Sequence, residues 1–232
     1  MKYSRIFILA CLPILAVNLF SVAYDIEWMV NTTEFLVYFP LFVGFYKRLD
    51  FANFNIIAFL GLSLVAAIFN FFHEARPIYF IAMFFSMTSY FFLIREAVRY
   101  TQRETANKFM LFFFFILVAV NIYFLFQHLR QMEMHLAGVI EVGFYSAYYI
   151  NLLVLAIVAL IYYLNSYSRK SVFFISLVMA VVVSDVLRDM AAFYLRDTSV
   201  LIIESILRFT GVILAFQFYA TEEKKLRLIN LV

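Results

Sequence analysis

Turn-forming residues are scarce in this 232-residue chain. It contains only five glycines and three prolines, so a fold built from many tight turns is not expected. Charged residues make up 14% of the sequence, whereas a soluble domain carries about 25%. Both shortages point away from a soluble globular protein.

Cysteine is almost absent as well. The single Cys11 excludes an intrachain disulfide and a metal site built from several cysteines. The small net charge of +3 gives no indication of nucleic-acid binding. His73, His128 and His135 show no HExxH pattern. We expect no metal, no haem and no other cofactor; a histidine site at the outer surface, shared with Glu133, is the weaker alternative.

Apolar and aromatic side chains are abundant instead. Hydrophobic residues account for 66% of the sequence, which holds 31 phenylalanines and 16 tyrosines. Eight continuous apolar runs approach or reach the roughly 20 residues that a transmembrane helix needs, and their continuity excludes the alternation of a β-barrel. We predict an all-α, polytopic membrane protein with one domain over residues 1–232. The predicted spans are 5–24, 33–46, 54–72, 78–94, 109–127, 138–164, 172–195 and 200–219.

The first run has a second interpretation. Lys2 and Arg5 precede it, as in a signal peptide, and the residues before Cys11 faintly resemble a lipoprotein cleavage site. However, Cys11 lies too close to the N-terminus, and the apolar run continues to about Tyr24. A first transmembrane helix is therefore the favoured interpretation.

Lysine and arginine gather at alternate junctions between the runs. The junctions after the second, fourth and sixth runs are basic, as are both termini, while the other junctions are more acidic. The positive-inside rule then predicts eight transmembrane helices with both termini cytoplasmic. We expect a multi-pass protein of a bacterial inner (plasma) membrane, with membrane lipid as its partner and no nucleic acid. The basic residues are Lys2, Arg5, Lys47, Arg48, Arg95, Arg99, Arg103, Lys108, Arg169, Lys170, Lys224, Lys225 and Arg227.

The run 172–195 carries charge well inside a membrane-length segment. Asp185, Arg188 and Asp189 stand at i, i+3 and i+4, so they share one helix face. The next run contains Glu204 and Arg208, which also share a face. Each such charge costs about 2.5–3.5 kcal/mol on insertion, so charges there are usually paired and often functional.

Counting from a tight turn near Asp197 gives the expected pairing of these charges. It places Asp185 level with Arg208 and Arg188 close to Glu204, so we predict these two ion pairs. Three acids against two arginines leave one carboxyl over, which in a dry pocket tends to keep its proton. A protonated acid beside an ionised one suits general acid/base hydrolysis. Ion pairs that only join the two helices are an equally weighted alternative.

Other polar residues lie at compatible depths and could together line a cavity that opens outward. For any single Asn or Ser, an interhelical hydrogen bond of about 0.6 kcal/mol is the commoner role. Glu141, Tyr145 and Asn70 are the candidates for contact with a substrate. The whole set is Asn18, Glu34, Asn70, Ser86, Thr88, Ser89, Tyr90, Asn121, Glu141, Tyr145, Tyr148, Tyr149 and Asn151.

One motif carries a family resemblance. The stretch FFISLVMAVVVSDVL, with Ser184, Asp185 and Leu187, resembles the seventh helix of the YhhN family, the lysoplasmalogenase-like membrane hydrolases. GVILAFQFYA, with Ala215 and Gln217, is a loose match to the family's eighth helix, and FFSMTSYF is similar to its aromatic-rich fourth helix. The eight-helix plan agrees along most of the chain, but only the Ser-Asp motif is specific.

Three positions depart from the family pattern. The acid of the family's third helix has no counterpart in LGLSLVAAIFNFF, where Ala66 or Ala67 takes its place and Asn70 is the nearest polar residue. The family's Lys-Pro in the second helix is Phe39-Pro40 here. Ser89, or a neighbour, stands where the fourth helix of the family has a histidine.

The resemblance implies hydrolysis of the vinyl-ether bond of a lysoplasmalogen, which gives a fatty aldehyde and a glycerophospho-base. Asp185 would be catalytic, with Asp189 or Glu204 in place of the missing acid. Arg188 or Arg208 could hold the phosphate of a lysophospholipid, and Ser184 belongs to the matching motif.

Two other classes of function stay open. A non-catalytic protein that binds a lipid or small molecule, or that is a subunit of a membrane assembly, agrees with the missing acid. A transporter with the acids as a proton relay is the third. The absence of inverted repeats and of helices broken by glycine or proline speaks against it. Whether the chain is an enzyme is thus left open by its sequence.

Overall fold

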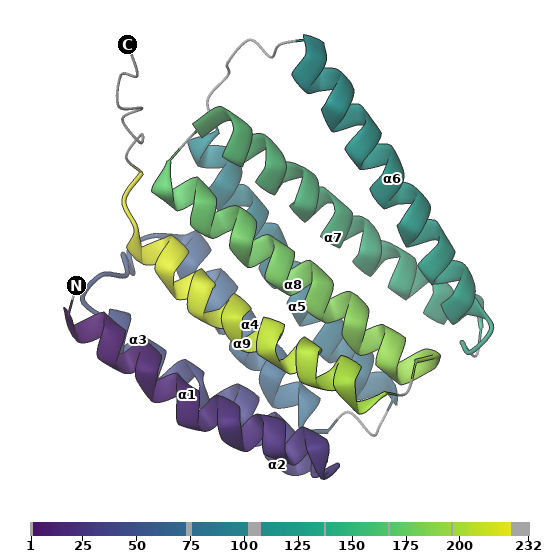
Figure 1. Ribbon diagram of the computed structural model, residues 1–232, viewed down its shortest axis with the longest axis horizontal. Helices are drawn as coiled ribbons and strands as arrows, with labels where there is room; N and C mark the ends of the chain where they lie inside the picture. Colours follow the sequence, from purple (N-terminus) through teal and green to yellow (C-terminus); the bar gives the residue numbers. More distant parts are fainter. Residues whose placement is uncertain are drawn as a thin grey trace.

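Figure 1 shows the computed structural model, which is a bundle of α-helices. It describes residues 2–72, 76–101, 108–136, 138–166, 168–195 and 197–223, and these contain no β-strand. The all-α prediction is confirmed. The helices are α1 (Lys2–Ala23), α2 (Glu27–Leu36), α3 (Tyr38–Phe45), α4 (Phe54–Asn70), α5 (Arg76–Tyr100), α6 (Lys108–Glu133), α7 (Val139–Ser166), α8 (Arg169–Phe193) and α9 (Thr198–Ala220).

In the described part of the chain, six helices are long and apolar enough to cross a membrane, namely α1, α5, α6, α7, α8 and α9. α4 is apolar too but has only 17 residues. By the length and composition of its helices, the chain is a multi-pass membrane protein. The predicted spans match the helices closely, although several helices continue into flanking charged residues. α5, for example, continues past Ile94 to Tyr100.

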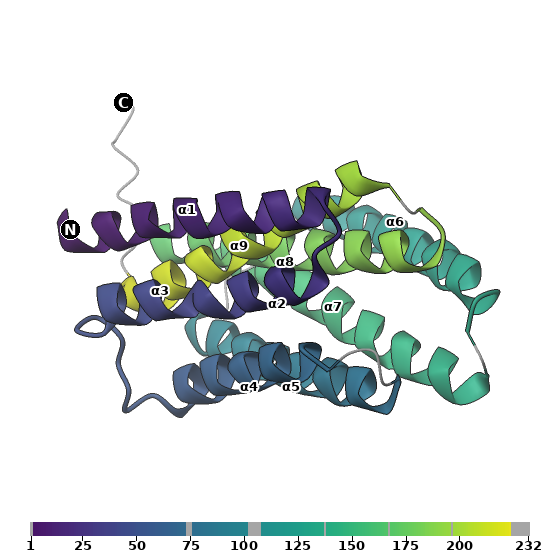
Figure 2. The same cartoon turned by 90° about the horizontal axis from the view of Figure 1, so that it is seen from below.

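The predicted second span, residues 33–46, consists of two short helices. α2 and α3 meet at Val37 and follow one another in line beside α1 (Figure 2). Pro40 explains the break, because it has no N–H to donate to the carbonyl of Leu36 and its ring crowds that carbonyl. α2 also begins earlier than predicted, at Glu27, so Glu34 lies within a helix rather than at its outer end.

α8 and α9 form an antiparallel pair at the centre of the bundle (Figure 1). Gly211 of α9 lies so close to α8 that a Cβ atom added to it would be 3.4 Å from Val181. α9 begins after Asp197, whose carboxylate accepts a hydrogen bond from the Ser199 backbone N–H at 2.9 Å. Hydrogen bonds from the Ser199 hydroxyl and backbone lower the pKa of Asp197. The predicted tight turn at Asp197 therefore contains a capping residue.

A buried polar group holds α4 to α5 at the end of the bundle where α8 begins. Glu96 of α5 is 1% exposed and accepts hydrogen bonds from Asn53 at 2.9 Å and Asn55 at 2.8 Å. The ammonium of buried Lys170 lies 3.9 Å from the centre of the Tyr100 ring, a cation–π contact. The sequence pattern did not single out Glu96, because it lies among the basic residues that end α5.

α6 is the most peripheral helix. It diverges from α7 over its first part and approaches it near its end (Figure 1). Phe112, Phe115 and Phe124 are 65–73% exposed, whereas Met132 near the end of α6 is fully buried. A helix that is apolar on all sides suits a lipid environment. Among the described side chains of α6, the buried ones, His128 and Met132, lie toward its end.

Two glycines test the packing of α1 against α3. A Cβ atom on Gly44 would lie 2.6 Å from the Cβ of Phe7, whereas one on Gly61 would meet no atom within 4 Å. We expect Gly44→Ala to lower the free energy of unfolding by about 1–3 kcal/mol through overpacking. Gly61→Ala should leave it unchanged or raise it by up to about 1 kcal/mol, because alanine favours helix. Unfolding of both variants in one detergent measures the difference, and equal stabilities would contradict the close approach of α1 and α3.

Candidate functional site

Two neighbouring cavities lie inside the bundle. The narrow cavity, of about 120 Å³, is lined by α2, α3, α4, α5, α8 and α9. The wide cavity, of about 400 Å³, lies between the α1–α2 turn and parts of α5, α7, α8 and α9. Glu34, Asn70, Arg188 and Arg208 line both. These four residues therefore mark the boundary between the two cavities.

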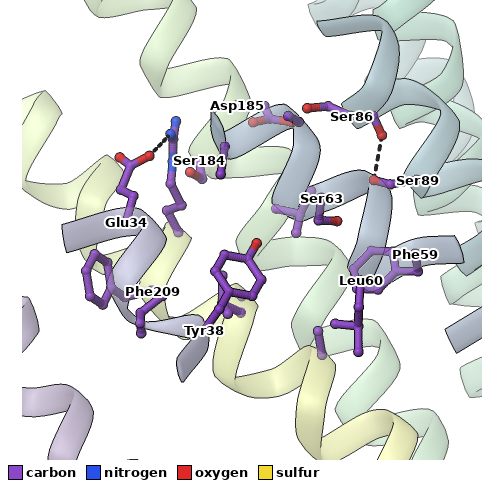
Figure 3. A pocket seen from close by; sticks show the side chains of 18 of the residues that line it. Glu34, Tyr38, Phe59, Leu60, Ser63, Ser86, Ser89, Ser184, Asp185 and Phe209 are labelled. Carbon is purple, nitrogen blue, oxygen red and sulfur yellow. Dashed lines mark hydrogen bonds and ion pairs between the residues drawn. The ribbon is translucent and has the colours of Figure 1, made fainter. Parts of the chain in front are cut away.

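The narrow cavity has a polar part and an apolar part. Figure 3 shows Glu34, Ser184 and Asp185 around its polar part, with Phe59 and Leu60 at the opposite side. The hydroxyl of Tyr38 points into the space between them (Figure 3). Such a cavity suits a molecule with one polar and one apolar portion.

Asp185 is the acid of α8 that faces the narrow cavity. Its Oδ2 oxygen accepts hydrogen bonds from the hydroxyl of Tyr90 at 2.9 Å and from that of Tyr148 at 2.5 Å. Its Oδ1 oxygen lies 3.4 Å from Nη1 of Arg188. The predicted i, i+3 neighbours on α8 are thus in contact. Three helices, α5, α7 and α8, hold this carboxylate in place as a hydrogen-bond acceptor.

Asp189 is on the same helix but faces away from both cavities. It is 0% exposed, and neither cavity includes it. Nε of Arg188 lies 3.3 Å from its Oδ1 oxygen, and the Tyr149 hydroxyl donates to its Oδ2 oxygen at 2.6 Å. The hydroxyl of Tyr79 lies 3.5 Å from Oδ1, at the outer limit for a hydrogen bond. Arg188 is therefore shared between two aspartates.

Arg208 of α9 is shared in the same way between two glutamates. Its Nη2 contacts Oε1 of Glu204, one turn earlier on α9. Its Nη1 lies 2.7 Å from Oε2 of Glu34 on α2. Glu34 is thus part of the charge cluster, together with Asp185, Arg188, Asp189, Glu204 and Arg208. From the sequence, Glu34 was expected only as one of the scattered polar residues.

The predicted ion pairs, Asp185 with Arg208 and Arg188 with Glu204, are wrong. The reason is the register of α8 against α9. The Ser184 hydroxyl donates to Oε1 of Glu204 at 3.2 Å, so Glu204 lies level with Ser184, about one turn further along α8 from the connection than Arg188. Each arginine finds closer acids: Arg188 has two on its own helix, whereas Arg208 has Glu204 on its own helix and Glu34 on α2.

Tyrosine hydroxyls complete the cluster. With Glu34 included, four acids surround two arginines, rather than the predicted three. Uncharged donors from α5 and α7 supply further hydrogen bonds to Asp185 and Asp189. Tyr79 was missed, yet it stands 11 residues before Tyr90, which is about three helical turns and hence the same face. That spacing was the signal that could have found it.

The other predicted substrate-contact residues divide between the cavities and the rest of the protein. Ser184 lines the narrow cavity, Tyr145 the wide one, and Asn70 both. Glu141, in the first turn of α7, lines neither. Ser86, Ser89 and Tyr90 also line the narrow cavity.

Three asparagines make backbone or interhelical hydrogen bonds instead. Asn18 donates to the Thr33 hydroxyl at 2.8 Å, which joins α1 to α2. Asn151 donates to the Met87 carbonyl at 3.0 Å, which joins α7 to α5. Asn121 bonds within α6. These are the commoner roles expected for isolated polar residues in membrane helices.

The residues that α4 contributes to the narrow cavity are all uncharged. They are Phe59, Leu60, Ser63, Ala66, Ala67 and Asn70, so no acid of α4 faces Asp185. Among the described residues, no group of three or more His, Cys, Asp or Glu side chains is placed to hold a metal ion. His73 and Glu74 lie outside the described part of the chain, as do Arg103, Arg196 and the basic residues after Glu223.

Double-variant measurements distinguish the observed ion pairs from the predicted ones. We expect Arg208→Met to lower the free energy of unfolding by about 3–5 kcal/mol, because it leaves Glu34 and Glu204 buried without their cation. Adding Glu204→Gln should recover roughly 1–3 kcal/mol of that loss through coupling. Adding Asp185→Asn should recover nothing. Unfolding in detergent measures all four proteins, and the reverse pattern of recovery would restore the pairing predicted from the sequence.

Comparisons with known proteins do not assign the chain to a family. No protein-family model matches the chain, and the comparisons with curated proteins and with solved structures find no match either. The interpretation of the two cavities therefore rests on their geometry and on the motif around Asp185.

Proposed function

We propose that the chain crosses the membrane eight times, with both termini in the cytoplasm. α2 and α3, of 10 and 8 residues, together reach about 28 Å, which supports counting them as one pass. The start of α1 and the end of α9 lie at the same end of the bundle (Figures 1 and 2), as an even number of passes requires. Lys47, Arg48 and Arg169 lie at or beside the helix ends on that side, which supports its cytoplasmic location. A bacterial inner membrane is the proposed location.

Reporter fusions test this topology. A reporter fused after Val232 should be active only as a cytoplasmic reporter, and one inserted between α6 and α7 only as an external reporter. Comparison of a cytoplasmic with an external reporter enzyme at each site gives the answer. The same side for both sites would remove one pass from the proposal.

Within this protein, the proposed activity is that of a lysoplasmalogenase-like hydrolase. One observation carries this proposal. Asp185, at the centre of the Ser-Asp motif, lines a cavity that also contains both arginines, a second carboxylate and an apolar wall. A lysoplasmalogen offers matching parts, namely a phosphate, a reactive vinyl ether and a hydrocarbon chain.

The arginines are placed to receive the phosphate. The side chains of Arg188 and Arg208 are 26% and 20% exposed and border both cavities. Arginine binds phosphate oxygens with two parallel hydrogen bonds. The head group would then occupy the wide cavity, which has the larger volume. The narrow cavity has room for about four waters, at roughly 30 Å³ each, and it would take only the atoms near the vinyl ether.

Glu34 replaces Asp189 and Glu204 as the partner of Asp185 in this proposal. Asp189 reaches neither cavity, and Glu204 does not line the narrow one. Arg208 contacts both Glu34 and Glu204, and its single charge balances only one of them. The proposal therefore assigns one proton to this pair of acids and places it on Oε1 of Glu34, the oxygen that Arg208 does not contact. Asp185 is surrounded by donors, so it acts as the carboxylate of the pair.

The reaction then follows general acid/base chemistry. Glu34 donates its proton to the vinyl carbon that is not bonded to oxygen. The product is an oxocarbenium ion, which the Asp185 carboxylate stabilises. Water adds to the carbon of that ion and gives up a proton to Asp185. The resulting hemiacetal breaks its bond to the glycerol oxygen, which takes the proton held by Asp185 and leaves as an alcohol. The hemiacetal hydroxyl gives its proton to Glu34 as the chain leaves as a fatty aldehyde, so both acids return to their starting states.

Release of fatty aldehyde from a lysoplasmalogen by the purified protein tests the activity. We expect Asp185→Asn and Glu34→Gln each to reduce the rate about 100-fold or more, the usual contribution of a general acid or base. Glu133→Gln is the matched control, because Glu133 is an exposed acid at the end of α6. Wild-type protein that releases no aldehyde contradicts the enzyme proposal.

A lipid-binding protein without turnover is the second candidate. The observation that favours it is α4, which offers no acid to the narrow cavity: the residues it contributes are Phe59, Leu60, Ser63, Ala66, Ala67 and Asn70. The sharing of each arginine between two acids also suits a stable structural network. In the same preparation, binding of a fluorescent lysophospholipid that is lost in Arg188→Met, without aldehyde release, would identify this function.

A further inference from the structure

Asp189 is sealed from both cavities, yet a line of hydrogen bonds leads from it toward the surface. The line passes through Tyr149 of α7 and His128 of α6 and ends at Tyr194, just after α8. We call these four residues the relay. Tyr149 is 0% exposed and His128 is 8% exposed, while Tyr194 is only partly buried. The relay therefore joins the most buried acid of the cluster to a partly exposed hydroxyl.

Each link of the relay has the length of a good hydrogen bond. The Tyr149 hydroxyl lies 2.6 Å from Oδ2 of Asp189. Nε2 of His128 lies 2.6 Å from the Tyr149 oxygen, and Nδ1 lies 2.8 Å from the Tyr194 oxygen. Both nitrogens of the imidazole are thus engaged, one on each side of the ring.

The direction of these hydrogen bonds follows from the number of protons. The Tyr149 hydroxyl has one proton and gives it to Asp189, so its oxygen must accept from Nε2–H of His128. A neutral imidazole with its proton on Nε2 accepts at Nδ1, and Tyr194 then donates there. All three hydrogen bonds therefore point toward Asp189.

We propose that the relay is a proton path between Asp189 and the side of the membrane where α8 ends. For one proton to enter, water gives a proton to the Tyr194 oxygen, and the Tyr194 proton moves to Nδ1 of His128. The Nε2 proton of His128 moves to the Tyr149 oxygen, and the Tyr149 proton moves to Asp189. Each intermediate group gains one proton and loses one. The ring ends with its proton on Nδ1, and the reverse transfers restore it.

A second hydroxyl, that of Tyr79, lies near Asp189 and belongs to a residue that lines the wide cavity. It is 3.5 Å from Oδ1, at the outer limit for a hydrogen bond, whereas the Tyr149 hydroxyl is 2.6 Å from Oδ2, so the relay is the better-connected route to Asp189. The charged and titratable groups around Asp189 are Arg188 and Asp185 on α8, Tyr149 on α7 and Tyr79 on α5. Those that contact His128 are Tyr149 and Tyr194. The path does not depend on lysoplasmalogen hydrolysis, since it needs only the relay and water.

Protonation of Asp189 has a consequence for the narrow cavity. Arg188 divides its guanidinium between Asp189 and Asp185. When Asp189 gains a proton, Arg188 loses one of its two anionic partners. Its charge is then left to Asp185 and to any anion at the boundary of the cavities. A proton that enters at Tyr194 therefore changes the charge balance at the candidate site.

Infrared spectroscopy after a rapid drop in pH tests the path in the full-length protein. The band of the protonated Asp189 carboxyl is identified by its loss in Asp189→Asn. We expect Tyr194→Phe, which removes only the entry hydroxyl, to slow the rise of this band about tenfold or more and to leave its final height unchanged. His128→Gln should slow it as well. A change in final height alone would show a structural role and would overturn the path.

Matched controls separate the path from general damage. Tyr123→Phe removes a hydroxyl from an exposed residue of α6, and His135→Gln removes an exposed imidazole next to the end of that helix. Both should leave the rate unchanged. Equal rates in wild type and Tyr194→Phe would mean that protons reach Asp189 by another way. A wild-type protein whose Asp189 band never forms while it stays folded would overturn the proposal too.

Discussion

The sharing of each partly buried arginine between two carboxylates is the interaction on which the rest of this structure depends. An arginine taken out of water is stable only if its charge and its hydrogen bonds are met by fixed partners. Arg188 finds both of its acids on α8, whereas Arg208 needs Glu34 from α2. The first pairing is therefore set by the helix itself, and the second holds α2 against α9. The two cavities meet at these arginines, whose side chains line both of them.

Tyrosine explains how four acids are accommodated with only two arginines. A hydroxyl donates a hydrogen bond to a carboxylate without adding a charge to the membrane interior. Tyr90 and Tyr148 donate hydrogen bonds to Asp185, and Tyr149 donates one to Asp189. These donors come from α5 and α7, so the same contacts that satisfy the acids also fix those helices to α8. The abundance of tyrosine in the sequence thus has a structural reason as well as a compositional one.

The helices could be predicted because long apolar runs have few alternatives in a membrane, and the charge cluster could be located because charge is costly there. The partners of these charges could not be predicted from the sequence. Counting from Asp197 assumes that residues equally far from the turn on α8 and α9 lie side by side. In the structure Glu204 lies beside Ser184, so α9 is offset along α8 by about one helical turn. This offset changes which charged residues of the two helices face each other. Glu34 was missed as a partner because nothing in a local pattern says which face of a short helix, broken before Pro40, turns toward α9.

Asp185 and Asp189 lie one helical turn apart on α8 but have different surroundings. They share Arg188, yet Asp185 faces a cavity and Asp189 faces the packed interface with α7. A ligand can therefore reach only the first, and in the proposed path a proton reaches the second by way of His128. Because the guanidinium lies between them, the state of one acid alters the charge that the other must balance. In the proposed path, events at the surface near Tyr194 and at the narrow cavity are thus linked through the single side chain of Arg188.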